Sequence, residues 1–143
     1  MRTFSEITDQ DLAQVLELWE RCESARASGN VIEYIYAARN PPSASILIGK
    51  KAGDVVCGAI VGFTGQRGWI NDICVDKRYQ RQGFGRAIVA AAETWLAERG
   101  APNIRLKVPY TNLAVIGFYD KLGYRFQDAV VLGKVVPALR MTA

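Results

Sequence analysis

The feature that most constrains this chain is a loop with two glycines between a strand pattern and a helix pattern. Residues 69–75, WINDICV, have the period of a β-strand. Residues 80–85, QRQGFG, form the loop. From Phe84 onward, apolar residues recur on one helical face until Gly100 ends the pattern: Phe84, Ile88, Ala91 and Trp95. This order predicts a helix that crosses back over a sheet.

The loop itself has the chemistry of an anion site. Glycines let the backbone turn tightly and let an anion approach closely. The first N–H groups of the following helix have no intrahelical partner, and the helix dipole favours negative charge there. Arg81 and Arg86 add positive charge. A GxG pattern alone is also typical of a plain helix start, and the sequence lacks both a Walker ending and a complete dinucleotide fingerprint.

The rest of the chain predicts a mixed α+β domain with helices on both faces of a sheet. A Thr8–Asp11 capping box begins a helix over 9–23. The other predicted elements are a strand over 1–5, a helix over 31–39, strands over 43–50, 55–63 and 103–108, a helix over 112–122, and one or two strands over 124–126 and 129–136. No repeat or linker interrupts them, so we expect a single domain over 1–143.

Composition excludes several chemistries. The chain has no histidine, which removes Ser-His-Asp catalysis and most zinc sites, so no metal is expected. Its three cysteines, Cys22, Cys57 and Cys74, lie far apart in apolar surroundings and are expected to be buried thiols.

Charge and hydropathy indicate which classes of binding partner the protein can have. The net charge is +4, but the basic residues concentrate at 77–86, which favours a compact anionic ligand over nucleic acid. No apolar run reaches the about 18 residues of a membrane span, and the first residues lack a signal core. We therefore expect a cytoplasmic protein without nucleic-acid or membrane partners.

Two blocks of sequence carry a family resemblance. The run ICVDKRYQRQGFGRAIV, 73–89, resembles the signature of the GNAT N-acetyltransferase superfamily, and NLAVIGFYDKLGYRF, 112–126, is similar to its second marker. The resemblance implies the GNAT-type acyl-CoA N-acyltransferase fold. That fold has a mostly antiparallel sheet of six to seven strands, splayed at a central parallel pair, and about four helices. It also implies transfer of an acetyl group from acetyl-CoA to a primary amine in a ternary complex.

The resemblance assigns roles by position. The pyrophosphate of acetyl-CoA would be held by the backbone of Arg81, Gln82, Gly83, Phe84, Gly85 and Arg86. Pantetheine would pair with the backbone of Ile73, Cys74 and Val75, and the Ile73 amide would stabilise the oxyanion. Asn112 would bond the pantetheine arm, Phe118 would pack near the thiol, and Tyr119 would be the general acid.

The general base is where the chain departs from the family pattern. Trp69, Asn71 and Lys107 stand at positions where relatives place a titratable base. A solvent path or a water held by Asn71 is the leading interpretation, and Glu33 is a weaker candidate. Strand alternation predicts that Asp72 points away from the face of Asn71 and Ile73.

The acceptor is left open by the sequence. A small metabolite, an amino acid, an antibiotic or a protein N-terminus would each fit. The chain is similar to small bacterial GNAT proteins and, more distantly, to the ribosomal-protein N-terminal acetyltransferases, although Lys107 counts against the latter. Arg105 and Lys107 would favour an acidic acceptor if their face lines the cleft, and they carry no such meaning if that face is solvated. A non-catalytic acyl-CoA sensor is the alternative function, and a homodimer is expected from the family.

Overall fold

The computed structural model describes residues 3–22, 43–64 and 66–137. The chain divides into two compact units, 1–108 and 109–143, and each is described by itself. The predicted helix over 31–39, with Glu33, lies outside the described residues.

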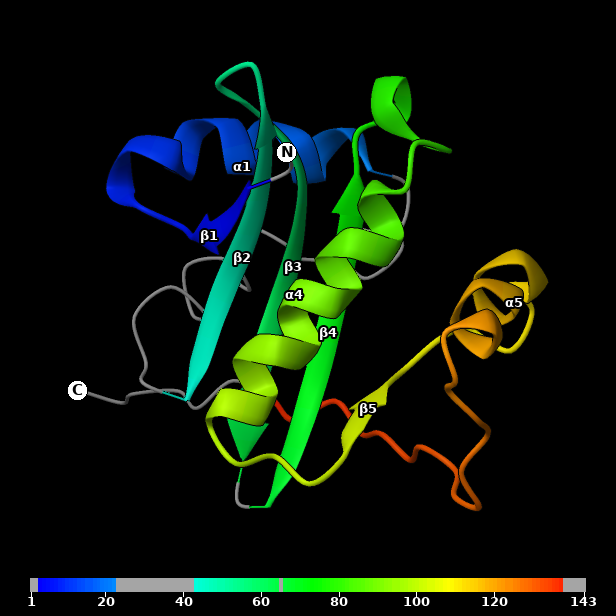
Figure 1. Ribbon diagram of the computed structural model, residues 1–143. Coiled ribbons are helices and arrows are strands. Elements are labelled where there is room, and N and C mark those ends of the chain that lie inside the picture. Colours follow the sequence, from blue (N-terminus) through cyan, green and yellow to red (C-terminus); the bar gives the residue numbers. More distant parts are fainter. Residues whose placement is uncertain (1–2, 23–42, 65, 138–143) are drawn as a thin grey trace. The chain divides into compact units, whose positions relative to one another are not determined.

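The first unit is built on one five-stranded sheet in the order β1-β2-β3-β4-β5 (Figure 1). Its strands are β1 (Thr3–Glu6), β2 (Ala44–Lys51), β3 (Asp54–Thr64), β4 (Arg67–Val75) and β5 (Ile104–Leu106). The first four pair antiparallel, and β4 pairs parallel with β5. The mixed α+β class and the parallel pair are therefore confirmed, although this pair lies at the edge of the described sheet and not at its centre.

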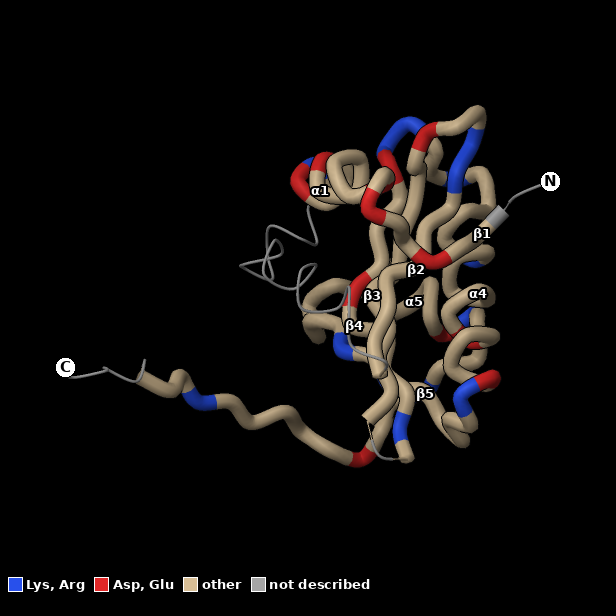
Figure 2. The backbone as a smooth tube through the Cα atoms, turned by 90° about the vertical axis from the view of Figure 1, so that its left-hand side faces the viewer, with Lys and Arg blue, Asp and Glu red and all other residues tan. Residues whose placement is uncertain are grey.

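Helices α1 (Leu12–Arg21) and α4 (Phe84–Glu98) lie on opposite faces of this sheet (Figure 2). The predicted capping box is present: the Thr8 backbone N–H and hydroxyl both donate to Asp11 Oδ2, at 3.0 and 2.8 Å. It begins a short 3₁₀ turn, η1 (Asp9–Asp11), that leads into α1. None of the described helices is long and apolar enough to cross a membrane.

Each face of the sheet has its own apolar core. Under α1, the buried cluster consists of Val15, Leu18, Trp19, Ile46, Ile48, Val55, Ile60 and Cys74. The contact is so close that a Cβ on Gly58 would lie 2.5 Å from the Trp19 ring, which explains the glycine. Along α4, Phe84, Ile88 and Trp95 are buried as predicted, whereas Ala91 is half-buried.

In its described residues, 109–137, the second unit holds one helix, α5 (Leu113–Lys121), which Gly123 ends with a φ of 96°. The predicted strands over 124–126 and 129–136 are wrong for this structure. A strand exists only through its ladder partner, and the described residues 124–137 form no ladder and leave Val130 and Val135 exposed. The described part of the chain thus has five strands and three α-helices, against six to seven strands and about four helices expected.

Candidate functional site

The glycine loop ends at the N-terminus of α4 and includes two residues with positive φ. Arg81 and Gly83 have positive φ values of 63° and 86°, and Gly83 is the N-cap residue. The first bond of the helix joins the Ala87 N–H to the Gly83 carbonyl at 3.1 Å. Residues 84–86 precede this bond in the first turn, and the N-terminus of a helix fits a phosphate group.

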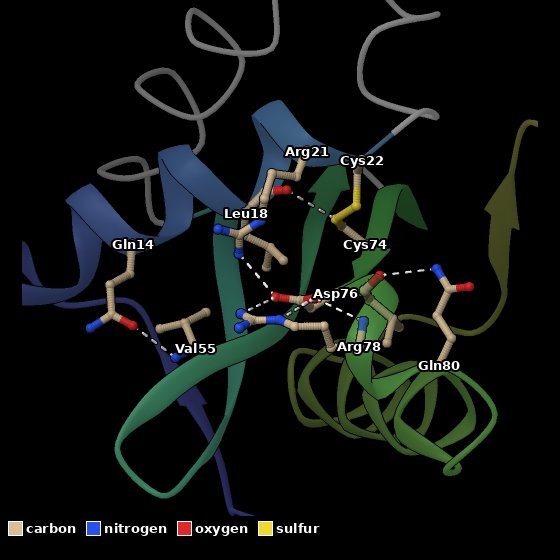
Figure 3. A network of polar contacts seen from close by, with 10 residues as sticks. Gln14, Leu18, Arg21, Cys22, Val55, Cys74, Asp76, Arg78 and Gln80 are labelled. Atoms are coloured by element: carbon tan, nitrogen blue, oxygen red, sulfur yellow. Dashed lines mark hydrogen bonds and ion pairs between the residues drawn. A yellow bond between two sulfur atoms is a disulfide. The ribbon is translucent and has the colours of Figure 1, made fainter.

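Asp76 fixes the start of this loop (Figure 3). Its side chain is only 4% exposed. It accepts hydrogen bonds from the Arg78 backbone N–H at 3.0 Å and pairs with the Arg78 and Arg21 guanidiniums, each at 3.0 Å. The Arg78 side chain, above all, lowers the pKa of Asp76. Arg78 is therefore used to shape the turn, whereas Arg81 and Arg86 are exposed beside the helix start.

β4 separates from β5 just before the loop. The parallel pairing joins only Gly68–Ile70 to Ile104–Leu106, while β4 continues to Val75 with β3 as its neighbour. Ile73, Cys74 and Val75 lie in this one-sided stretch. Such an edge can pair with an extended, amide-containing ligand in the way that a further strand would. The Gln80 side-chain amide already donates to the Val75 carbonyl there, at 3.2 Å.

A β-bulge in β4 changes which face its polar side chains occupy. Asp72 pairs with Ile60 and Ile70 pairs with Val61, so Asn71 is the inserted residue. The Asn71 amide nitrogen lies 3.6 Å from a Cβ built on Gly62, and Asp72 Oδ2 accepts the Trp19 indole N–H at 3.3 Å. Both side chains are thus on the α1 face.

The prediction that Asp72 points away from the face of Asn71 is therefore wrong, because the extra residue interrupts the alternation on which it was based. Asp72 is half-buried. Burial raises its pKa, and the hydrogen bonds from the Trp19 indole and the Ile73 N–H offset that rise only in part.

The cysteines also differ from expectation. Cys22, which follows α1, and Cys74 on β4 form a disulfide, with 6.2 Å between their Cα atoms (Figure 3). The Cys74 Sγ lies 3.6 Å from the Leu18 carbonyl oxygen. Because this sulfur is in a disulfide, it has no proton to donate to that oxygen. The expectation of three buried thiols holds only for Cys57. The partners are separated by 52 positions, so no local pattern could have paired them.

Trp69 and Lys107 form a contact of their own. Trp69 pairs with Arg105 across the parallel strands, and the Lys107 Nζ lies 5.5 Å from the centre of the Trp69 ring. Trp69 also pairs with Gly62, which places it on the α1 face with Asn71 and Asp72. The lysine that stands at a base position of some relatives is here an exposed cation beside an aromatic ring.

The other site residues expected from the sequence are on or next to α5 in the second unit. Asn112 is the N-cap of α5, and its side-chain oxygen accepts the Val115 N–H at 3.3 Å. Tyr119 is 7% exposed, with the rings of Phe118 and Tyr124 packed edge-on at 5.0 and 5.4 Å. Their roles toward acetyl-CoA stay predictions. Among the described residues, no cluster of side chains could hold a metal ion.

Comparisons with known proteins agree with this arrangement. The profile of the Acetyltransferase (GNAT) family matches residues 9–124. An acetyltransferase of Yersinia pestis is 33% identical over 124 residues, which cover 87% of this chain and 88% of the relative.

Two solved structures are similar as well. The ribosomal-protein-S18-alanine N-acetyltransferase of Escherichia coli is 25% identical with a TM-score of 0.71, covering 86% of this chain and 77% of that one. An aminoglycoside N-acetyltransferase solved with CoA has a TM-score of 0.77 at 13% identity, covering 94% and 95% of the two chains, and shows the shared fold. The chain belongs to the acetyltransferase (GNAT) family and is an acetyltransferase with acetyl-CoA as its cosubstrate.

Proposed function

We propose that this protein transfers the acetyl group of acetyl-CoA to a primary amine, on a small molecule or a peptide, by direct attack in a ternary complex. One observation carries the proposal: the stretch of β4 beyond its pairing with β5 leads, through a turn held by Asp76, to the N-terminus of α4. An edge for an extended amide chain is thus followed by a site for a phosphate group, in the order in which pantetheine and pyrophosphate follow one another in CoA.

The first unit supplies the donor site in this proposal. The amides from Arg81 to Arg86 would hold the pyrophosphate, with the two arginine side chains adding charge. The backbone of Ile73, Cys74 and Val75 would pair with pantetheine. The Ile73 N–H would polarise the thioester carbonyl and stabilise the oxyanion that develops on it.

The second unit supplies the acid. A phenol, with a pKa near ~10, is protonated at neutral pH and can donate to a departing thiolate. Tyr119 has the burial and aromatic packing that hold such a phenol in one orientation. Asn112, with its oxygen used as a helix cap, would bond the pantetheine arm through its amide nitrogen, and Phe118 would pack near the thiol.

The acceptor is a primary amine that binds on the α1 face of the sheet, and the residues of that face select it. Similar structures include an enzyme named for an alanine of a ribosomal protein and one named for aminoglycosides. A cytoplasmic location and a homodimer belong to the same proposal.

Release of CoA thiol from acetyl-CoA, measured over a panel of amines, tests this function. We expect amine-dependent release from the wild type. A protein that is stabilised against heat by CoA and yet releases no thiol with any amine would instead be an acyl-CoA sensor.

Tyr119→Phe tests the acid. It removes one hydroxyl from a buried ring, and we expect kcat to fall by about 10²-fold, the lower range for a general acid. Tyr124→Phe is the matched control, because it removes the hydroxyl of the neighbouring ring. Equal kcat values for wild type and Tyr119→Phe would show that the acid is another group.

A further inference from the structure

We propose that Asp72 is the general base that takes the proton from the attacking amine, an inference that rests on the proposed function. The sequence offers no base at Trp69 or Asn71, neither of which titrates, and β4 contains one carboxylate, that of Asp72. The bulge at Asn71 gives this carboxylate its place.

The bulge determines the face of the sheet to which the Asp72 side chain points. Without an inserted residue, Asp72 would be on the α4 side of the sheet, away from Trp69. With Asn71 inserted, Trp69, Asn71 and Asp72 all point to the α1 face. The carboxylate is half-buried and not sealed, and the neighbouring Asn71 is exposed, so a ligand on this face can reach it.

The carboxylate also lies next to the predicted oxyanion donor. The Ile73 N–H donates to the Asp72 carboxylate in this structure, and the thioester carbonyl oxygen would take the carboxylate's place at that N–H. An amine that attacks a carbonyl held at that N–H therefore approaches within reach of the carboxylate. General-base catalysis needs this proximity first and a suitable pKa second.

The negative charge of Asp72 is compatible with a role as general base and is unfavourable for a carboxylate that takes no part in the reaction. An ionised carboxylate beside a developing oxyanion would raise the energy of the transition state by like-charge repulsion. A carboxylate that gains a proton as the oxyanion forms becomes neutral at that moment. The groups that act on its pKa in the described structure are the Trp19 indole and the Ile73 N–H, both uncharged, together with burial, which raises the pKa.

The step balances as follows. The amine nitrogen bonds to the thioester carbonyl carbon and becomes acidic, and its proton moves to the Asp72 carboxylate. The carbon–sulfur bond then breaks, and CoA leaves as a thiolate that takes a proton from Tyr119. Asp72 loses its proton to solvent and Tyr119 regains one, so the products are the acetamide and CoA thiol.

Asp72→Asn tests the proposal, because asparagine keeps the size of the side chain and an oxygen to accept the Trp19 indole N–H. We expect kcat/KM to fall by about 10²- to 10³-fold and the acidic limb of its pH profile to disappear. CoA affinity, measured by calorimetry, should be unchanged. Asp54→Asn, at the exposed first residue of β3, is the matched control and should keep wild-type kinetics.

A second measurement does not depend on turnover. The carboxyl carbon of Asp72, followed by NMR in ¹³C-labelled protein, should titrate above the exposed aspartates and at the pH of the acidic limb. Trp19→Phe removes a donor that lowers this pKa, so it should move both the NMR midpoint and the limb to higher pH.

The outcomes are distinct. Loss of the limb in Asp72→Asn, with matching NMR and kinetic midpoints in the wild type, supports the proposal. A variant that retains the limb and kcat/KM within about threefold of wild type overturns the base role alone. A wild type that releases no thiol with any amine overturns the proposed function, and the base role with it.

Discussion

Asp72 and Asp76 are four residues apart and both contact α1, but the pKa of Asp72 is raised and the pKa of Asp76 is lowered. Asp76 is nearly inaccessible, yet its pKa is lowered, because two guanidiniums and a backbone N–H surround it. Asp72 is half-buried, and its pKa is raised because burial disfavours the charged form, while its two donors, an indole and one N–H, offset this only in part. Burial disfavours the charged form of both carboxylates, and charged partners outweigh that effect at Asp76 alone.

The residue midway between them, Cys74, should give the largest effect on stability. Its bridge to Cys22 closes a long loop, and we expect reduction to lower the free energy of unfolding by about 3 kcal/mol. Urea unfolding with and without reductant measures this. Cys22→Ser should lack the reductant effect, and equal curves for oxidised and reduced wild type would contradict the role of the bridge.

Asp76→Asn should have the next largest effect. It removes the charge that pairs with Arg21 and Arg78, and we expect a loss of about 2 kcal/mol at pH 7, since hydrogen bonds to charged groups contribute about 1.5–3. Asp54→Asn serves as the control in the same urea titration. A change of less than about 0.5 kcal/mol in the free energy of unfolding, as is usual for surface substitutions, would contradict the structural role of Asp76.

Asp72→Asn should have the smallest effect on stability and the opposite sign. The folded state of the wild type holds a carboxylate that burial disfavours, so the variant should be as stable as wild type or more stable, by about 1 kcal/mol at most, at pH 7. A clear loss of stability would mean that the ionised carboxylate is a structural element like Asp76.

The pH dependence sharpens the same comparison. The raised pKa of Asp72 gives a penalty that is fully present above its folded pKa and disappears as the pH falls toward its unfolded value near ~3.9. The lowered pKa of Asp76 gives stability that is present above that unfolded value and is lost as the pH falls through the folded pKa. The Asp72→Asn advantage should therefore shrink on mild acidification, before the Asp76 contribution is lost, as urea titrations between about pH 7 and 3 would show.

Local pattern predicted much of the fold and of the donor site. The capping box at Thr8, the strand over 69–75, the glycine loop and the helix from Phe84 are all present. These features depend on neighbouring residues: a side chain reaching its own backbone, a period of two or 3.6, and a glycine where φ is positive.

The predictions that were wrong depend on distant partners. The strands over 124–126 and 129–136 needed a ladder that the described residues do not provide, and the thiols of Cys22 and Cys74 met across 52 positions. The sequence WINDICV contains no glycine to mark a bulge, so the faces of Asn71 and Asp72 could not be read from it.

The amino-acid sequence by itself determined the family and the donor, because the motifs that carry the resemblance are runs of consecutive residues. The tertiary structure alone decided the surroundings of Asp72 and Asp76. One inserted residue, visible only in the register of β4 against β3, turned Asp72 to the face of α1, and Arg21, 55 positions away, met Asp76 only when α1 packed on the sheet. Charge environments are made by contacts between elements, and such contacts exist only in the folded chain.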